Sequence, residues 1–410
     1  MISKQAKFIN AKILFLLASL GFAMLFNGCS YIKNSFFIKK QPSLVRVPIA
    51  NYPDFIDDMD IDGLDHAISQ SLFYLKKRPN TRKFRFGEDI ISAAHMIKSL
   101  EYFRDFLRTN PKPSEIKRFI SKNYRVYKST GQKKSKKVLF TGYYEPMLHG
   151  SITRSDEYKY PIYAIPKDLV TINLSLFSPK FKNQKLVGRL SSRSVVPYHD
   201  RKAIEERNVL KKKGDILAWI NNPIDLFFLQ IQGSGKVYLE NGETINVHYH
   251  GNNGHQYRSI GKLLINDGEI TPSDMSMQAI RHYLKNHPDK QRHVFNYNPS
   301  YVFFKLEEDG PLGCLSVPLT AGRSIATDQR LLPPGALGII KTQKPIVDGN
   351  GKIYKWVNFS RFVLNQDSGG AIQGPGRVDI FWGNGPYAET VAGHLKHVGE
   401  LYILIRKPRD

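Results

Sequence analysis

From residue 312 onward, the chain consists almost entirely of short strand-like runs separated by glycine and proline turns. The turns and runs are, in order, Pro333-Pro334-Gly335, Asp348-Gly349-Asn350-Gly351, 353–364, 377–382 and 401–406. Short strands divided in this way favour a small β-barrel. This feature constrains the fold more than composition does, and it predicts a mainly β architecture for the C-terminal part.

The preceding residues combine helical and strand-like patterns. Apolar residues recur at helical spacing in two stretches, Leu64, Ile68, Leu72 and Leu75, then Met96, Leu100, Phe103 and Leu107. The spacing predicts two helices whose apolar faces lie in a core, followed by a shorter helix over 114–122. Strands are predicted at 138–144, 226–232 and 244–250, and a further helix is predicted to carry Met277, Ile280 and Leu284.

The N-terminus has the pattern of a secretory signal. Three lysines precede an apolar run from Ile13 to Phe26, which is short for a membrane span. Residues 1–28 are therefore predicted to be a signal peptide. The Gly28-Cys29 pair resembles a bacterial lipobox, so Cys29 is expected to be lipidated, and Ser30 favours the outer membrane by the same resemblance. Residues 29–59 are then expected to form a lipid-anchored tether.

The charge balance indicates an anionic partner. The chain has 60 Lys and Arg against 36 Asp and Glu, a net charge of +24. This suits nucleic acid, an anionic membrane or an acidic polymer. An exported chain is not expected to meet nucleic acid, and loss of residues 1–28 removes three lysines and leaves +21. The two cysteines exclude a disulfide framework, and Cys314 is expected to be a small buried residue.

The densest candidate for chemistry lies at 365–393, where acidic residues stand among glycines and aromatic side chains. Along 377–382 a period of two places Asp379 on the strand face opposite Val378 and Ile380. An acidic residue is unfavourable in a strand unless it faces a groove. Desolvation there would raise the pKa of Asp379 and make it a usable acid near neutral pH. A salt-bridged Asp379 and a turn-capping Asp367 are the structural alternatives.

Three other segments could contact a ligand. Tyr143 and Tyr144 follow a glycine and suit stacking on sugar faces, although ordinary strand packing explains them equally well. Gln232 and Ser234 belong to a Gln-Gly-Ser-Gly run, which is either a turn or a set of polar substrate contacts. The third segment is 318–324 with Thr327 and Asp328 beyond it, and it contains Arg323.

His248, His250 and His255 are candidates for a metal site. His248 and His250 share a strand face, and His255 follows five residues later. Zinc sites use such histidines, but no acidic ligand follows at a suitable spacing. No metal and no cofactor are therefore expected.

Taken together, these segments resemble one family, the membrane-bound lytic murein transglycosylase A family. The matching pieces are Phe140-Thr-Gly-Tyr-Tyr144, Gln232-Gly-Ser-Gly235, Tyr257-Arg-Ser-Ile-Gly-Lys262, Met275-Ser-Met-Gln-Ala-Ile-Arg-His282, Ser300-Tyr-Val-Phe-Phe304, Val317-Pro-Leu-Thr-Ala-Gly-Arg-Ser324, Asp367-Ser-Gly-Gly-Ala-Ile372 and Val378-Asp-Ile380. They follow family order over roughly 140–393. Two departures are one extra residue between Asp367 and Asp379, and Glu145 where the family pattern has Thr.

The resemblance implies a mainly β fold with flanking helices, in which a double-psi β-barrel and an inserted, mainly β second domain enclose a groove. The expected ranges are 60–146 for the first part of the barrel with its N-terminal helices, 147–310 for the insert and 311–410 for the second, catalytic part. The expected partners are peptidoglycan glycan strands and, through Cys29, the outer membrane facing the periplasm. Nucleic acid is not expected as a partner, and the protein is expected to be monomeric.

The family's activity is cleavage of the β-1,4 bond between N-acetylmuramic acid and N-acetylglucosamine without water. The resemblance assigns the acid/base role to Asp379 and supporting roles to Asp367 and Asp328. The expected substrate contacts are Tyr143, Tyr144, Gln232, Ser234, Arg323 and Trp382.

Two alternatives stay open at this point. One is a hydrolase of the same glycan that pairs Asp379 with Glu145 across the distances typical of glycosidases. The other is a non-catalytic envelope protein that binds peptidoglycan and releases no soluble product.

Overall fold

The computed structural model describes residues 42–408 except 133–134, 183, 212 and 350. The predicted signal peptide, Cys29 and the first part of the predicted tether lie outside these residues. None of the helices that the described residues form is long and apolar enough to cross a membrane.

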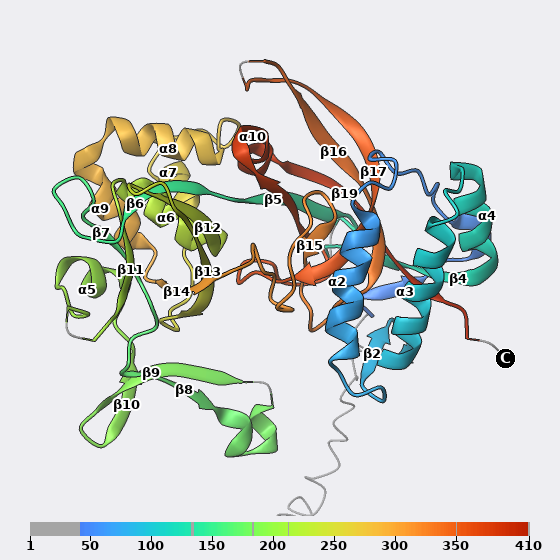
Figure 1. Cartoon of the computed structure of the whole chain (residues 1–410), viewed down its shortest axis with the longest axis horizontal. Coiled ribbons are helices and arrows are strands. Elements are labelled where there is room, and N and C mark those ends of the chain that lie inside the picture. Colours follow the sequence, from blue (N-terminus) through green and yellow to red (C-terminus); the bar gives the residue numbers. More distant parts are fainter. Residues whose placement is uncertain (1–41, 133–134, 183, 212, 350, 409–410) are drawn as a thin grey trace, which may run out of the picture. The chain divides into compact units, whose positions relative to one another are not determined.

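An eight-stranded sheet forms the first of two main β units (Figure 1). Its strands are, in spatial order, β1 (Leu44–Arg46), β4 (Tyr124–Ser129), β19 (Lys396–Arg406), β16 (Leu337–Val347), β17 (Ile353–Asp367), β15 (Ser324–Ala326), β18 (Arg377–Asn384) and β5 (Val138–Glu145). β5 also pairs with β19, so six of the strands close into a barrel and leave no free edge between them. The mainly β barrel fold that the sequence predicts is confirmed.

Helices cover the barrel where the periodicity predicted them. They are α2 (Leu64–Lys76), α3 (Ala93–Leu107) and α4 (Pro113–Asn123), with the hairpin β2 (Lys83–Phe86) and β3 (Asp89–Ser92) between the first two. Their apolar faces share one core with the barrel strands. The chain returns to this core at α10 (Gly385–His394), which follows β18 directly.

The N-terminal residues of the barrel unit correct the tether prediction. β1 pairs with β4, and the 3₁₀ turn Ile49–Asn51 follows it. Beyond this turn, Asp57 accepts two hydrogen bonds from the Arg323 guanidinium, at 2.6 and 2.9 Å. From Pro42 to residue 59 the chain is therefore part of the barrel unit rather than a tether, because its apolar and acidic residues are used in packing.

The second β unit lies between β5 and β15 in sequence. Its six-stranded sheet has the order β14 (Val302–Glu307), β13 (Thr244–Asn252), β12 (Ser234–Leu239), β6 (Met147–Ser151), β11 (Ile216–Ile220) and β7 (Tyr160–Tyr163). A separate sheet has the order β10 (Ser194–Pro197), β9 (Lys185–Ser191) and β8 (Leu169–Asn173), with 3₁₀ turns at Leu174–Leu176 and Pro179–Phe181. The helices are α5 (Arg201–Glu206), α6 (Pro223–Gln232), α7 (Ile260–Asn266), α8 (Met277–Asn286) and α9 (Pro288–Tyr297).

The strand predicted at 226–232 is wrong, since these residues belong to α6. The run Leu226-Phe-Phe-Leu is apolar on every side because the helix packs against two cores, so it shows no period. Asn222 caps the helix through its side chain and Pro223 occupies its first turn, both of which are helix-start signals. We refer below to residues 147–310 as the insert; as domain boundaries, the ranges 60–146, 147–310 and 311–410 stay predictions.

Candidate active site

Asp379 is fixed by its place in the barrel. It lies on β18 opposite Thr141 of β5 and opposite Ala326 of β15, so backbone pairing holds it from both sides. Val378 and Ile380 on the other face are fully buried in the barrel core. The period-two prediction is therefore confirmed: the strand buries its apolar face and turns Asp379 outward. Asp379 is half-buried and lines a cavity of about 510 Å³.

Asp367 reaches the same cavity from the end of β17. Ala326 is the register partner of both Asp367 and Asp379, one on each side of the short strand β15. Two strand spacings separate the two backbones, roughly 10 Å. The short strand 324–326 therefore explains how two acids that are twelve positions apart in sequence come to face one cavity.

The pKa of Asp379 is raised to about 6. Burial is the main cause, because desolvation disfavours the carboxylate, and the negative charge of Asp367 adds to it. Hydrogen bonding from Thr141 and the nearby Arg377 act in the opposite direction. The Thr141 hydroxyl donates to Asp379 Oδ1 at 2.8 Å, and Arg377 Nη2 donates to the same hydroxyl at 3.4 Å. With this pKa, about a tenth of the Asp379 carboxyl groups are still protonated at pH 7, far more than for an ordinary aspartate.

Asp367 is held by donors on all sides. Its carboxylate accepts from the backbone N–H groups of Cys314 and Ser368 and from the Tyr143 hydroxyl, each at 2.8 Å. Burial raises its pKa, while these hydrogen bonds act against that shift. The Tyr143 ring also packs against Phe381, with ring centroids 5.3 Å apart. Tyr143 therefore lines the cavity and orients Asp367.

Asp328 does not line this cavity. It is buried, and its carboxylate accepts from the Arg330 side chain and from the backbone N–H of Gly374 at 2.9 Å. These contacts lower its pKa despite burial. Asp328 fixes the loop between β17 and β18, which carries the extra residue. In the same loop, Gly376 has no room for a side chain, since a Cβ there would lie 2.5 Å from the backbone nitrogen of Gln132.

The predicted substrate contacts separate into two groups. Tyr143, Gln232 and Ser234 line the cavity. Gln232 also accepts from the backbone N–H of Tyr144 at 3.2 Å, which ties α6 to β5.

Arg323, Trp382 and Tyr144 do not line the cavity, and all three are buried. Arg323 is bound by Asp57, Trp382 packs against Phe359 in the barrel core, and Tyr144 donates to Glu389. Their predicted roles as sugar contacts are therefore corrected to structural ones.

Cys314 corrects another expectation. It is exposed and lines the cavity beside Asp367, rather than being buried in a core. Its pKa is raised to about 12, mainly by desolvation and by the charge of Asp367. A thiol in this state is a poor nucleophile at neutral pH.

The histidines do not converge. His248 is buried, and its Nδ1 accepts from the backbone N–H of Leu312 at 3.2 Å. His255 Nε2 bonds the carbonyl of Tyr198 instead. Among the residues that the structure describes, no group of three or more His, Cys, Asp or Glu side chains is arranged to hold a metal ion. Leu312 and Cys314 flank Gly313, so His248 instead helps to position the loop that donates to Asp367.

Sequence reasoning missed several residues of the cavity. Arg201 is fully buried at its edge and donates to Gln230 Oε1 at 2.6 Å and to the carbonyl of Ser300 at 2.7 Å. Tyr257 and Asn298 line the cavity from the insert. The only sequence signals for these residues were the motifs that begin at Tyr257 and Ser300. These residues lie far from the acids along the chain, so the sequence did not indicate that they share a cavity with them.

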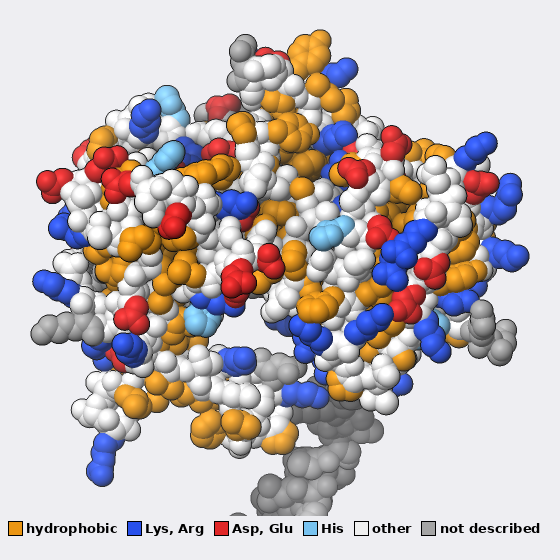
Figure 2. Space-filling model, in the orientation of Figure 1, with side chains coloured by type: hydrophobic (Ala, Val, Ile, Leu, Met, Phe, Trp, Pro, Cys, Tyr) orange, Lys and Arg blue, Asp and Glu red, His pale blue; other side chains and the backbone are white. Residues whose placement is uncertain are grey.

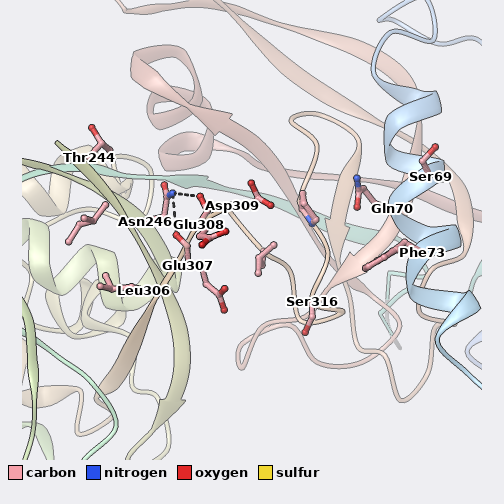
Figure 3. Close-up of a pocket in the computed structure, with 13 residues that line it drawn as sticks. Ser69, Gln70, Phe73, Thr244, Asn246, Leu306, Glu307, Glu308, Asp309 and Ser316 are labelled. Carbon is pink, nitrogen blue, oxygen red and sulfur yellow. Dashed lines mark hydrogen bonds between the residues drawn. The ribbon is translucent and has the colours of Figure 1, made fainter.

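A larger hollow of about 1010 Å³ lies on another side of Leu312, which lines both spaces. In Figure 3, Ser69, Gln70 and Phe73 of α2 lie across it from Thr244 and Leu306. Its acidic residues are Glu307, Glu308 and Asp309, and none of the predicted catalytic residues lines it. The smaller cavity is therefore the candidate active site.

The fold and site define a barrel protein whose paired acids face a cavity completed by an inserted β unit. Residues 139–305 match the model of the MltA specific insert domain, and residues 323–405 match the model of the 3D domain. The chain belongs to the MltA family of membrane-bound lytic murein transglycosylases.

Individual relatives agree with this placement. Membrane-bound lytic murein transglycosylase A of Escherichia coli K12 is 38% identical over 274 residues, which span 66% of this chain and 66% of that protein. The crystal structure of such a transglycosylase from Agrobacterium tumefaciens is 31% identical, with a TM-score of 0.71 over 89% of this chain and 98% of that one. E. coli MltA with bound chitohexaose has a TM-score of 0.67 at 28% identity, covering 90% and 96%.

Proposed function

We propose that this protein cleaves the β-1,4 bond between N-acetylmuramic acid and N-acetylglucosamine in peptidoglycan, without water and with Asp379 as its single acid/base. The observation that carries this proposal is the carboxyl group of Asp379, which faces the cavity with its pKa raised to about 6. A general acid works best when its pKa lies near the operating pH. That a relative has been solved with bound chitohexaose supports a sugar chain as the ligand of the cavity.

The reaction begins with protonated Asp379 beside the glycosidic oxygen. The acid transfers its proton to that oxygen, the bond from the oxygen to C1 breaks, and positive charge develops at C1. The Asp379 carboxylate then takes the proton of the C6 hydroxyl of the same muramic residue. The C6 oxygen bonds to C1, which closes a 1,6-anhydro ring and leaves Asp379 protonated again. Because the nucleophile belongs to the substrate, an effective molarity of about 10⁵ M or more is available without a second carboxylate.

The surrounding residues support this cycle. Thr141 donates to Asp379 Oδ1, so Oδ2 is the oxygen left to carry the transferred proton. Asp367 lines the same cavity and its negative charge favours the developing positive charge at C1. Its three hydrogen-bond donors keep it oriented while the substrate changes.

Glu145 is poorly placed for the hydrolytic alternative. It lies four residues beyond Thr141 on β5, about 13 Å along the strand from the level of Asp379. Inverting glycosidases separate their two carboxyl groups by about 6.5–9.5 Å and retaining ones by about 5 Å. Glu145 is also buried, bonded to Asn384 and outside the lining of the cavity. These observations favour the single-acid reaction over a two-carboxylate hydrolysis.

The insert supports binding of a polar, uncharged chain. It contributes amide, hydroxyl and aromatic side chains to the cavity, including Gln232, Ser234 and Asn298, whereas both acids come from the barrel. Sugars suit such a surface, because their hydroxyl groups bond amides and their faces pack on aromatic rings. A purely binding protein would not need a carboxyl group with a raised pKa in the same cavity, so we favour an enzyme.

We also propose that the mature protein is a monomer held by lipid on Cys29 in the outer membrane, facing the periplasm. Relatives are membrane-bound by name, and the described helices offer no membrane span. The net charge of +21 after loss of residues 1–28 would keep the protein near anionic envelope polymers, and this attraction should weaken at high salt.

The test is the release of soluble fragments from purified peptidoglycan by the protein, by Asp379→Asn and by the exposed-site control Asp156→Asn. We expect Asp379→Asn to lose activity by about 10²- to 10⁴-fold, because Asn cannot donate or take the proton, and the control to match the parent. Mass spectrometry should find 1,6-anhydro products. Near-parental release by Asp379→Asn would overturn the role of Asp379, and products heavier by one water would establish hydrolysis instead.

A further inference from the structure

The three-stranded sheet of the insert has one uniformly apolar face. The pairing of β9 with β8 and β10 places one set of side chains on the same side. These residues are Val170, Ile172, Leu186, Gly188, Leu190, Val195 and Pro197. Leu186 and Leu190 are 54% and 66% exposed, and no residue of this set except Gly188 is buried. We call this set the apolar face.

The opposite side of the sheet meets the rest of the insert. Val187 lies so close to Gly254 that a Cβ on Gly254 would be 2.8 Å from the Val187 Cβ. Gly254 also has a φ of +79°, which favours glycine on its own account. One side of the sheet is therefore fixed by packing. The apolar face is the side that is left without a partner among the described residues.

Two turns beyond β8 add further exposed hydrophobic side chains to this part of the insert. Leu176 and Phe177 end the first 3₁₀ turn and are 83% and 74% exposed, and Phe181 ends the second. Large side chains with such exposure are rarely gathered on a surface that always faces water. Figure 2 shows hydrophobic side chains beside Lys and Arg over the region that Figure 1 labels β8 to β10. This gathering points to a surface that is covered in use.

Charge identifies the partner. The sequence has no Asp or Glu between Asp168 and Asp200, but it has five basic residues there, and four of them, Lys180, Lys182, Lys185 and Arg193, are exposed. A second copy would bring the same positive charges together. A neutral sugar chain would not require the apolar face. Aromatic and aliphatic side chains bordered by basic residues are the pattern of surfaces that bind anionic bilayers.

We propose that the apolar face and its 3₁₀ turns dock on an anionic phospholipid bilayer, as a second membrane contact besides any lipid anchor. Phe177, Leu176 and the apolar face enter the headgroup region, and Lys180, Lys182 and Arg193, which lie in the turns rather than on the packed side of the sheet, bind lipid phosphates. The sheet edges of β8 and β10 stay at the level of the headgroups, where water still satisfies their backbone groups. A bilayer contact of this kind orients the insert, and with it the cavity, relative to the membrane.

The test places a tryptophan probe at the surface of the full chain. Phe177→Trp is compared with Tyr354→Trp on the β16–β17 hairpin of the barrel, a matched control because Phe177 is 74% exposed and Tyr354 is 76% exposed. Vesicles contain phosphatidylethanolamine and phosphatidylglycerol with brominated acyl chains, which quench tryptophan at the depth of the bromine. We expect quenching and a blue shift for Phe177→Trp beyond that of the parent chain, and no such excess for Tyr354→Trp.

Two further measurements separate the partners. Adding Leu186→Ser and Leu190→Ser to the probe variant should raise the lipid concentration for half-maximal quenching about tenfold, because the variant buries less apolar surface in the bilayer. The fold should be retained, because both leucines are exposed. Phosphatidylcholine vesicles should quench less, as should high salt. Equal quenching at both probe positions, or none at Phe177→Trp, would overturn the proposal. A blue shift that depends on protein concentration without vesicles would instead identify a second copy as the partner.

Discussion

The barrel and the insert contribute different kinds of side chain to one cavity. Asp367, Asp379 and Tyr143 come from the barrel, on strands or strand ends whose backbones are paired within a closed sheet. The insert supplies amides, hydroxyls and aromatic rings, and its one charged residue at the cavity, Arg201, is already bonded to Glu205 and Gln230. In the proposed reaction, proton transfer takes place in the closed barrel, whereas substrate recognition takes place in the insert, whose sheets have open edges.

The barrel and the insert also differ in how deeply they bury the ion pair of an arginine. In the barrel, Arg323 and its partner Asp57 are both removed from water, with side chains 0% and 3% exposed. In the insert, Arg201 is as buried, but its partner Glu205 keeps contact with water. A buried pair is costly to break because the remaining charge loses its compensation. Breaking the Arg323–Asp57 pair should therefore cost more stability than breaking the Arg201–Glu205 pair.

The largest effect should follow from breaking that pair. Arg323→Ala leaves Asp57 buried without its guanidinium partner, and we expect the free energy of unfolding to fall by about 3–5 kcal/mol. Urea denaturation measures it. The control is Lys117→Ala, which removes the exposed pair with Asp54 in the same N-terminal segment and should cost less than about 1 kcal/mol. Equal losses in the two variants would show that Arg323 does not lock residues 54–58 to the barrel.

A smaller effect should come from the acid itself. The pKa of Asp379 is about 6 in the folded protein and 3.8 as its ordinary value, so the folded state holds a proton that the unfolded state has lost between these values. Stability therefore falls as the pH rises from about 4 to 6, and the cost persists above that range. Asp379→Asn should be more stable than the parent by about 1–2 kcal/mol at pH 8 and by almost nothing at pH 4. A gain independent of pH would contradict burial of the acid as its cause.

The smallest effect should separate recognition from chemistry. Tyr257 lines the cavity from the insert, and Tyr257→Ala should raise KM by about five- to tenfold while kcat changes little, since the stacking of one ring is worth about 1 kcal/mol. Tyr238→Ala is the control, because Tyr238 is similarly exposed on the insert but lies outside the cavity. A fall in kcat at unchanged KM would assign Tyr257 to the chemical step and weaken the division between the two parts.

Local patterns predicted much of the fold. The apolar spacing of α2 and α3 and the alternation along β18 needed only the period of a helix or strand, and the structure confirms them. The prediction of a strand at 226–232 was wrong because a helix that packs on two sides has no polar face, so its sequence shows no helical period. The tether prediction was wrong for the residues from Pro42 onward, because local patterns do not reveal distant partners. Asp57 pairs with Arg323, which lies 266 positions later in the chain.

The site was predicted less completely than the fold. Asp379 and Asp367 were visible because acids among glycines and aromatics are unusual near a strand. Arg323 was also predicted as a site residue, but the sequence alone cannot distinguish a buried ion pair from a ligand contact. In the structure, the Arg323 guanidinium forms an ion pair with Asp57. Thr141, His248 and Arg201 were missed as parts of the site because each acts through a partner brought near only by the fold, as when His248 accepts from Leu312.

The order of the barrel strands along the chain determines when the barrel can close. Thr141 and Asp379, which bond each other, are 238 positions apart, and the strand that closes the barrel, β19, follows every other described strand. A chain that still lacks β19 has no closed barrel, and Asp379 is not yet desolvated. If Asp379 is the acid, as we propose, cleavage can begin only after β19 has been added to the barrel, so synthesis itself delays the first cut in the polymer.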